Sequence, residues 1–116
     1  MRFLPTRIHG AIDYLWGLAL IAAPFVLGFA DGGAAQWTAL VAGAGALVYA
    51  ALTDFELGVW RLLPMPAHLV VDGLGGAALA ASPWLFGFAD RVRWPHVLFG
   101  LFAVVASFVT QKVPRG

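Results

Sequence analysis

Two pairs of ionisable residues carry most of the chemistry that this sequence could perform. His9 and Asp13 are four residues apart, and so are His68 and Asp72. In a helix, residues i and i+4 lie on the same face, so each histidine would lie beside a carboxylate. Imidazole and carboxylate groups together can relay protons, bind a divalent metal ion or pass a cation. The same groups can also serve only as polar contacts that fix how two membrane helices pair.

The two pairs belong to a longer pattern that occurs twice. Residues 9–31 read HGAIDYLWGLALIAAPFVLGFAD, and residues 68–90 read HLVVDGLGGAALAASPWLFGFAD. Histidine, aspartate, glycine and proline all match at one constant offset of 59 (68 − 9 = 59). Such an offset is typical of an internal repeat. Because the segment returns at residues 68–90, where no signal peptide can lie, we expect the first copy to be retained as well.

A second offset extends the repeat into the segment that follows. Trp37 aligns with Trp94 at an offset of 57 (94 − 37 = 57), and the same offset places Thr53 on Thr110. The repeat unit is therefore predicted to be a helical hairpin. We predict a first repeat at about residues 8–53, a connection at 54–66 and a second repeat at about 67–110, within one membrane domain covering residues 1–116.

The composition predicts where these hairpins lie. The chain has 116 residues, of which 61% are hydrophobic and 11% are charged, which is more apolar than a soluble domain of this size. Uncharged runs at residues 14–30, 32–53, 73–89 and 94–111 each approach the ~20 residues that a helix needs to cross a bilayer. We therefore predict an all-α fold, a four-helix transmembrane bundle made of two tandem hairpin repeats that point the same way. The lipid bilayer is the first expected partner.

The charged residues indicate an orientation and exclude some functions. With four spans, the side that holds both termini and the connection carries five Lys and Arg residues, against two in the short turns. This excess predicts that both termini are cytoplasmic. The connection, with Trp60 and Arg61, is expected to lie in the headgroup region. A net charge of +1 argues against a nucleic-acid partner, and the absence of cysteine excludes thiolate metal sites and thiol catalysis.

Prolines and small residues are expected to set how the helices bend and pack. Pro24 and Pro83 lie in the last third of the first and third predicted helices, which run to about residues 29 and 88, and they favour a kink there. The Ser82 hydroxyl can bond a carbonyl of its own helix, and Trp84 would lie at the membrane interface. His96 is expected to be a solvated interfacial residue. Close helix packing is assigned to five glycines, namely Gly43, Gly45, Gly73, Gly76 and Gly100.

One motif resembles a known family. Ser82-Pro83-Trp84, followed by Leu85-Phe86-Gly87-Phe88 in the first helix of a two-helix unit, resembles the SPW repeat of small bacterial membrane proteins. The resemblance covers residues 9–110. The first copy keeps only the proline, as Ala23-Pro24-Phe25, which favours a geometric role for the proline over a chemical role for the serine. The resemblance implies a multi-pass protein of the bacterial inner membrane, and it brings no catalytic or ligand-binding residues.

These observations favour a protein that acts by helix–helix association, as a structural or interaction component, with a second copy or another membrane protein as partner. No enzymatic activity, catalytic residue or cofactor is predicted, because the sequence contains no nucleophile–base pair and no complete metal motif. The alternative is a small transporter, or an oligomer that conducts protons or cations. It would use His9, Asp13, His68 and Asp72 as a polar cluster near the cytoplasmic end. Whether that cluster is a structural contact, a proton relay or a metal site stays open at this point.

Overall fold

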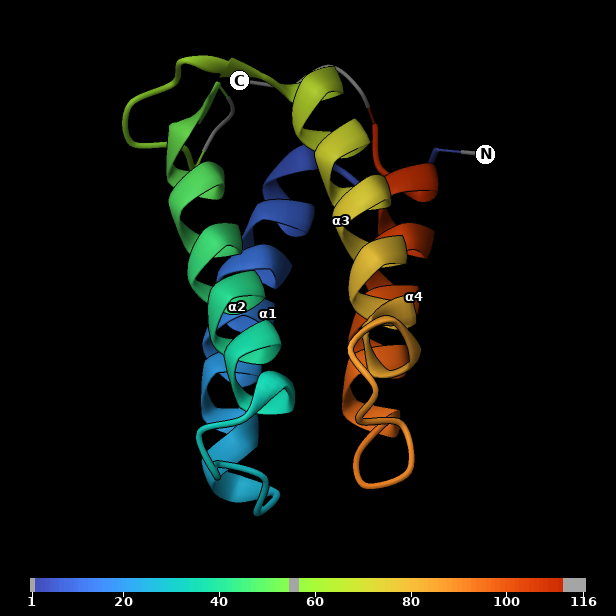
Figure 1. Cartoon of the computed structure of the whole chain (residues 1–116). Coiled ribbons are helices and arrows are strands. Elements are labelled where there is room, and N and C mark those ends of the chain that lie inside the picture. The colour runs from blue at the N-terminus through green and yellow to red at the C-terminus, as the bar shows by residue number, and fades with distance from the viewer. Residues whose placement is uncertain (1, 55–56, 112–116) are drawn as a thin grey trace.

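Two helical hairpins lie side by side in the computed structural model, which describes residues 2–54 and 57–111 (Figure 1). The first hairpin consists of α1 (Thr6–Val26) and α2 (Ala34–Leu52), and the second of α3 (Met65–Leu85) and α4 (Trp94–Val109). Two short strands, β1 (Thr53–Asp54) and β2 (Leu63–Pro64), lie between them. The predicted all-helical fold with four helices is thus confirmed for the described residues.

The first helix of each hairpin ends three residues earlier than predicted, because a glycine turns the chain. In α1, Gly28 has φ +82° and the Phe29 N–H donates to the Pro24 carbonyl at 2.8 Å. In α3, Gly87 has φ +76° and the Phe88 N–H donates to the Pro83 carbonyl at 2.8 Å. Both are Schellman ends, in which glycine adopts the left-handed conformation without a Cβ penalty.

The two Schellman ends also build the core at the turn end of the bundle. Phe29 and Phe88 fold back from these turns and are buried. There they pack with apolar residues of α1, α2 and α3, in a cluster of Leu20, Ala23, Phe29, Ala35, Ala39, Leu79 and Phe88. The Ser82 hydroxyl donates to the Leu79 carbonyl at 2.6 Å, as the sequence predicted for this side chain. The prolines therefore act at the helix ends, where they anchor the turn.

Within each hairpin the helices pack backbone to backbone. A Cβ atom added to Gly43 would lie 2.7 Å from the Gly17 carbonyl oxygen, and one added to Gly76 would lie 2.6 Å from that of Gly100. Side chains at these positions would force the helices apart. Gly73 is less crowded, with the Ser107 hydroxyl 3.2 Å from an added Cβ.

Helices of different hairpins make few direct contacts with each other. The two hairpins are joined chiefly at the end of the bundle where α1 begins and α4 ends. Strand β1 pairs in parallel with β2, with Thr53 opposite Leu63. Leu4 forms the corresponding bridge with Thr110. The segment leaving each hairpin therefore pairs with the segment entering the other. At the opposite end, the turns are linked by an ion pair between Arg91 and Asp31 at 2.6 Å.

The outer surface of the molecule is strongly apolar. Among the described residues, α1 and α2 are each long and apolar enough to cross a membrane. Large hydrophobic side chains project from every helix, including Leu18, Val48, Leu74 and Phe108, all more than half exposed. An apolar surface of this extent indicates contact with lipid or with other proteins.

Candidate functional site

The structure brings His9, Asp13, His68 and Asp72 together in one cluster, referred to below as the quartet. Its members come from the first eight residues of α1 and of α3, which enter the bundle from the same end. Each residue offers one ligand-type atom, and these atoms all lie within 4.8 Å of one another. Both histidines are fully buried, whereas the side chains of Asp72 and Asp13 are 6% and 14% exposed.

The shortest contacts of the quartet cross from one hairpin to the other. The Nε2 atom of His9 lies 2.7 Å from Oδ2 of Asp72, and Nε2 of His68 lies 2.7 Å from Oδ2 of Asp13. The contacts within one helix are longer, at 3.1 Å for His9 with Asp13 and 3.2 Å for His68 with Asp72. As the i,i+4 spacing predicted, the histidine and the aspartate of each helix lie close together. Each histidine, however, bonds most closely to the carboxylate of the other helix.

Two threonines hold the far side of the imidazole rings. The Nδ1 atom of His9 lies 2.6 Å from the Thr110 hydroxyl, and Nδ1 of His68 lies 2.6 Å from the Thr53 hydroxyl. Each hydroxyl lies 2.6 Å from a backbone carbonyl one turn earlier, that of Ala106 for Thr110 and that of Tyr49 for Thr53. A hydroxyl has a single proton, which it donates to the carbonyl, so its oxygen accepts from the imidazole Nδ1–H.

This assignment determines the charges in the cluster. With Nδ1–H donated to threonine, each Nε2 also needs a proton in order to bond a carboxylate at 2.7 Å. Each of these two short contacts therefore holds one proton between an imidazole nitrogen and a carboxyl oxygen, and without a bound ion the quartet carries no net charge. Buried charges are stable only when they are paired and hydrogen-bonded, and here all four meet that condition.

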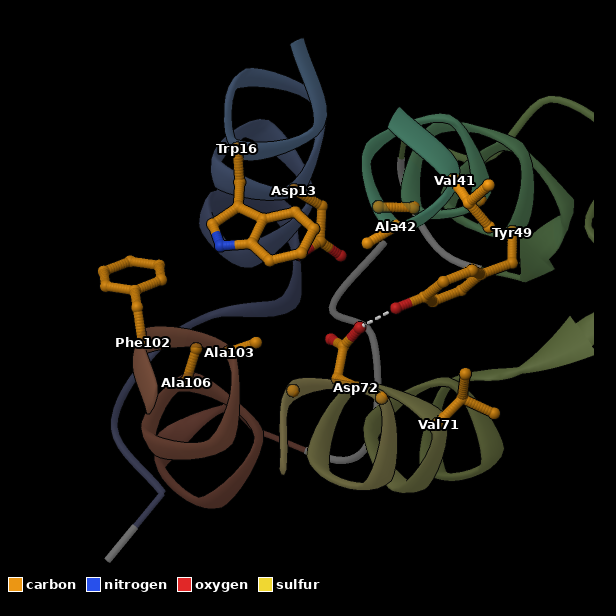
Figure 2. Close-up of a pocket in the computed structure, with 14 residues that line it drawn as sticks. Asp13, Trp16, Val41, Ala42, Tyr49, Val71, Asp72, Phe102, Ala103 and Ala106 are labelled. Carbon is orange, nitrogen blue, oxygen red and sulfur yellow. Dashed lines mark hydrogen bonds between the residues drawn. The ribbon is translucent and has the colours of Figure 1, made fainter. Parts of the chain in front are cut away.

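Tyr49 makes the cluster asymmetric. Its hydroxyl donates to Oδ1 of Asp72, as Figure 2 shows. The position 57 residues later is Ala106 (106 − 49 = 57), so the second hairpin has no tyrosine at the matching position to bond Asp13. A cavity of about 150 Å³ lies beside the two carboxylates, bordered by Trp16 on one side and Tyr49 on the other.

Three of the residues that form this site were not identified from the sequence. Thr53 and Thr110 could have been found, because they match at the offset that relates the second helices of the two repeats. Tyr49 has no such signal, because the matching position is an alanine. The site is thus larger than the four residues at its centre.

The remaining candidate residues lie elsewhere. Pro24, Ser82, Pro83 and Trp84 lie near the far ends of α1 and α3 and do not contribute to the quartet. The expectation that His96 is solvated is wrong, because its side chain is fully buried at that same end. Its Nε2–H donates to the Ala35 carbonyl at 2.9 Å, and its ring contacts the two phenylalanines that the Schellman turns fold inward.

Comparison with known proteins gives one match. The SPW repeat domain model matches residues 7–110, which is nearly the whole chain. The chain belongs to the SPW repeat family. The resemblance stated from the sequence is thereby confirmed, and with the apolar helices it indicates membrane association. Searches of curated proteins and of solved structures find no match.

Proposed function

We propose that the protein is a non-enzymatic, integral membrane component that acts by helix–helix association, with the quartet as the contact that holds its two hairpins together. All four helices would cross the bacterial inner membrane, with both termini cytoplasmic. The observation that carries this proposal is the crossed pairing of the quartet. Each histidine bonds the carboxylate of the other hairpin at 2.7 Å, at the end where the hairpins are joined.

The pairing of the quartet supports a structural role. Both nitrogens of each imidazole are bonded, as are both oxygens of Asp72. An average polar contact between membrane helices contributes about 0.6 kcal/mol. Removing one member of a buried ion pair, however, costs about 3–5 kcal/mol, because the remaining charge loses its partner. The quartet is therefore a strong constraint on how the hairpins pair.

The helix dimensions support four membrane crossings. α3 has 21 residues and spans roughly 31 Å at a rise of about 1.5 Å per residue. α4 has 16 residues and spans roughly 24 Å, so it would cross a hydrocarbon layer of about 30 Å together with the residues that flank it. In the four helices, the segments between the quartet and the short turns contain no Asp, Glu, Lys or Arg. These segments would lie in the hydrocarbon region, and the quartet would lie nearer the cytoplasmic interface, where charge is less costly.

The seam between α2 and α3 supports an association surface. An apolar groove of about 490 Å³ follows this seam and shares Val41, Ala42 and Gly75 with the cavity beside the quartet. A Cβ atom added to Gly45 or Gly75 would meet nothing within 4 Å. The packing role predicted for Gly45 is therefore not met within the part of the chain that the structure describes, where an added Cβ atom has open space. Small residues on an open seam let another helix approach closely, and we propose that a second copy of the chain occupies it.

The oligomeric state in lipid nanodiscs and mild detergent tests this proposal. We expect wild-type protein to form oligomers, and Gly75→Leu to weaken their formation, because Gly75 lines the groove and a leucine there would fill it. Val48→Leu is the control, since Val48 is exposed on α2 and lines neither the groove nor the cavity beside the quartet. Wild-type protein that stays monomeric at every protein-to-lipid ratio would refute self-association. Equal effects of the two variants would place the contact elsewhere.

The conducting alternative has one observation in its favour, since Asp13 and Asp72 both border the cavity. Against it, the segments between the quartet and the turns contain no Asp, Glu, Lys or Arg, and His96, near the turn end of α4, bonds a backbone carbonyl. We therefore expect no proton or cation flux above that of empty liposomes. Flux that is abolished by Asp13→Asn together with Asp72→Asn would overturn the structural proposal.

A further inference from the structure

We propose that the quartet is also a binding site for one divalent transition-metal ion, held by Nε2 of both histidines and Oδ2 of both aspartates. This inference goes beyond the structural contact proposed above, because a contact between hairpins requires only that the four groups pair. Metal binding requires that one donor atom from each group face a common centre.

The geometry of the four atoms fits that requirement. They form a closed ring in which nitrogen and oxygen alternate, with separations of 2.7, 3.1, 2.7 and 3.2 Å. A tetrahedral Zn²⁺ site with bonds of about 2.0–2.1 Å places its ligand atoms about 3.3 Å apart. Two of the four separations are already close to this value. The other two would need to widen by about 0.6 Å, which side-chain rotation can provide.

The threonines supply the supporting hydrogen bonds that ligand histidines typically have. Thr53 and Thr110 each accept the Nδ1–H of one imidazole and donate to a backbone carbonyl. This arrangement fixes the ring orientation, and it directs the lone pair of Nε2 towards the centre when that nitrogen is deprotonated. Tyr49 holds Asp72 in the same way, since its hydroxyl bonds Oδ1 and leaves Oδ2 facing the centre.

The donor set indicates the class of metal. Two imidazoles and two carboxylates suit Zn²⁺ and other first-row divalent ions. Ca²⁺ requires six to eight oxygen ligands, and Mg²⁺ prefers an octahedron of oxygens, so neither matches this set. The cavity of about 150 Å³ borders both carboxylates, and it has room for a water ligand or for an incoming ion.

The charge balance also favours binding. Without metal, each of the two Nε2–Oδ2 contacts at 2.7 Å holds one proton, so the quartet has no net charge. When one divalent ion binds, both Nε2–H bonds break, two nitrogen–metal bonds form, and two protons leave. The site then holds one dication, two neutral imidazoles and two carboxylates, so the buried net charge stays at zero. Exchange of one metal ion for two protons therefore avoids the cost of adding charge to an apolar interior.

Calorimetry with Zn²⁺ tests the proposal on chelator-treated protein in detergent micelles. We expect one Zn²⁺ per chain. Titrations in buffers of different ionisation enthalpy should show two protons released per ion. His9→Gln and His68→Gln should each lower the affinity at least 100-fold. Thr53→Val keeps all four ligands and should lower it about 10- to 100-fold, as loss of a supporting hydrogen bond typically does.

His96→Gln provides the matched control, because His96 is buried at the opposite end of the bundle and should leave Zn²⁺ binding unchanged. Circular dichroism and thermal unfolding of each variant establish that it is folded. Folded wild-type protein that binds no Zn²⁺ would overturn the proposal, as would binding that survives both histidine substitutions. Neither result would affect the structural contact, which is measured on the metal-free protein.

Discussion

Replacing Asp72 with asparagine removes the negative charge that three donors share. Nε2 of His9 lies 2.7 Å from this carboxylate, that of His68 lies 3.2 Å away, and Tyr49 donates to its second oxygen. Asparagine has nearly the same shape, so the substitution changes charge and hydrogen bonding with little change in volume. The two imidazole rings would then share the single carboxyl group of Asp13.

The expected cost follows from the burial of this group. Breaking a buried ion pair by removing one partner typically costs about 3–5 kcal/mol, and Asp72 is only 6% exposed. Asp13 is 14% exposed and lacks the tyrosine bond, so Asp13→Asn should cost about 1.5–3 kcal/mol less, corresponding to one hydrogen bond to a charged group. The predicted loss in the free energy of unfolding is therefore largest for Asp72→Asn, smaller for Asp13→Asn and smallest for the substitution of an exposed carboxylate.

Reversible unfolding of the metal-free protein in mixed micelles measures these free energies. Asp31→Asn is the matched control, because Asp31 lies in a short turn and its side chain is 43% exposed in the ion pair with Arg91. A loss below about 1 kcal/mol for Asp72→Asn would refute the reasoning, because the lost group would then be neither buried nor paired. Equal losses for Asp13→Asn and Asp72→Asn would contradict the role of Tyr49.

Three further predictions concern single side chains. Tyr49→Phe should reduce the free energy of unfolding by about 1.5–3 kcal/mol, measured in the same micelles, because it removes a hydrogen bond to a charged group. Gly43→Ala should destabilise by about 1–3 kcal/mol through overpacking, whereas Gly45→Ala, with open space around it, should stabilise by about 0.5–1 kcal/mol; thermal unfolding separates the two. The pKa of Asp31 lies below its ordinary value, first because the Gly33 backbone N–H donates to the carboxylate and then because Arg91 pairs with it. These contacts therefore stabilise the fold at neutral pH, and the stabilisation is lost as the pH falls through the lowered pKa. Arg91→Gln should raise that pKa only part of the way back, and NMR titration of the carboxyl carbon would contradict this if the pKa returned fully or did not move.

The meeting of the four ionisable residues follows from a pattern that the sequence displays. Because His9 and His68 match at one offset, and so do Asp13 and Asp72, equivalent hairpins would carry them at the same depth. The helix count follows equally well from the uncharged runs. These features depend on periodicity and composition, which the sequence contains directly.

The crossed pairing could not be predicted in this way. An i,i+4 spacing allows His9 to bond Asp13 or a partner on another helix, and only the approach of α1 to α3 decides between them. The hydroxyl of Thr53 likewise has several local partners at a helix end. Its choice of His68 depends on the pairing of β1 with β2.

The burial of His96 was missed for a related reason. A histidine beside Trp94 and Pro95 reads as an interfacial residue when the chain is considered locally. The Schellman turns at Gly28 and Gly87 instead fold two phenylalanines against its ring. Where a helix ends, and where the next side chains point, depends on the backbone conformation of a single residue. The composition of a segment does not predict that conformation.

A double-mutant cycle between His9 and Asp72 tests most directly whether the quartet joins the two hairpins. The free energies of unfolding are measured for His9→Gln, Asp72→Asn, the double variant and the wild type, all without metal. Directly bonded residues should show a coupling energy of about 1–3 kcal/mol. Single effects that add to within about 0.5 kcal/mol would mean that the two side chains do not meet, and would contradict the account.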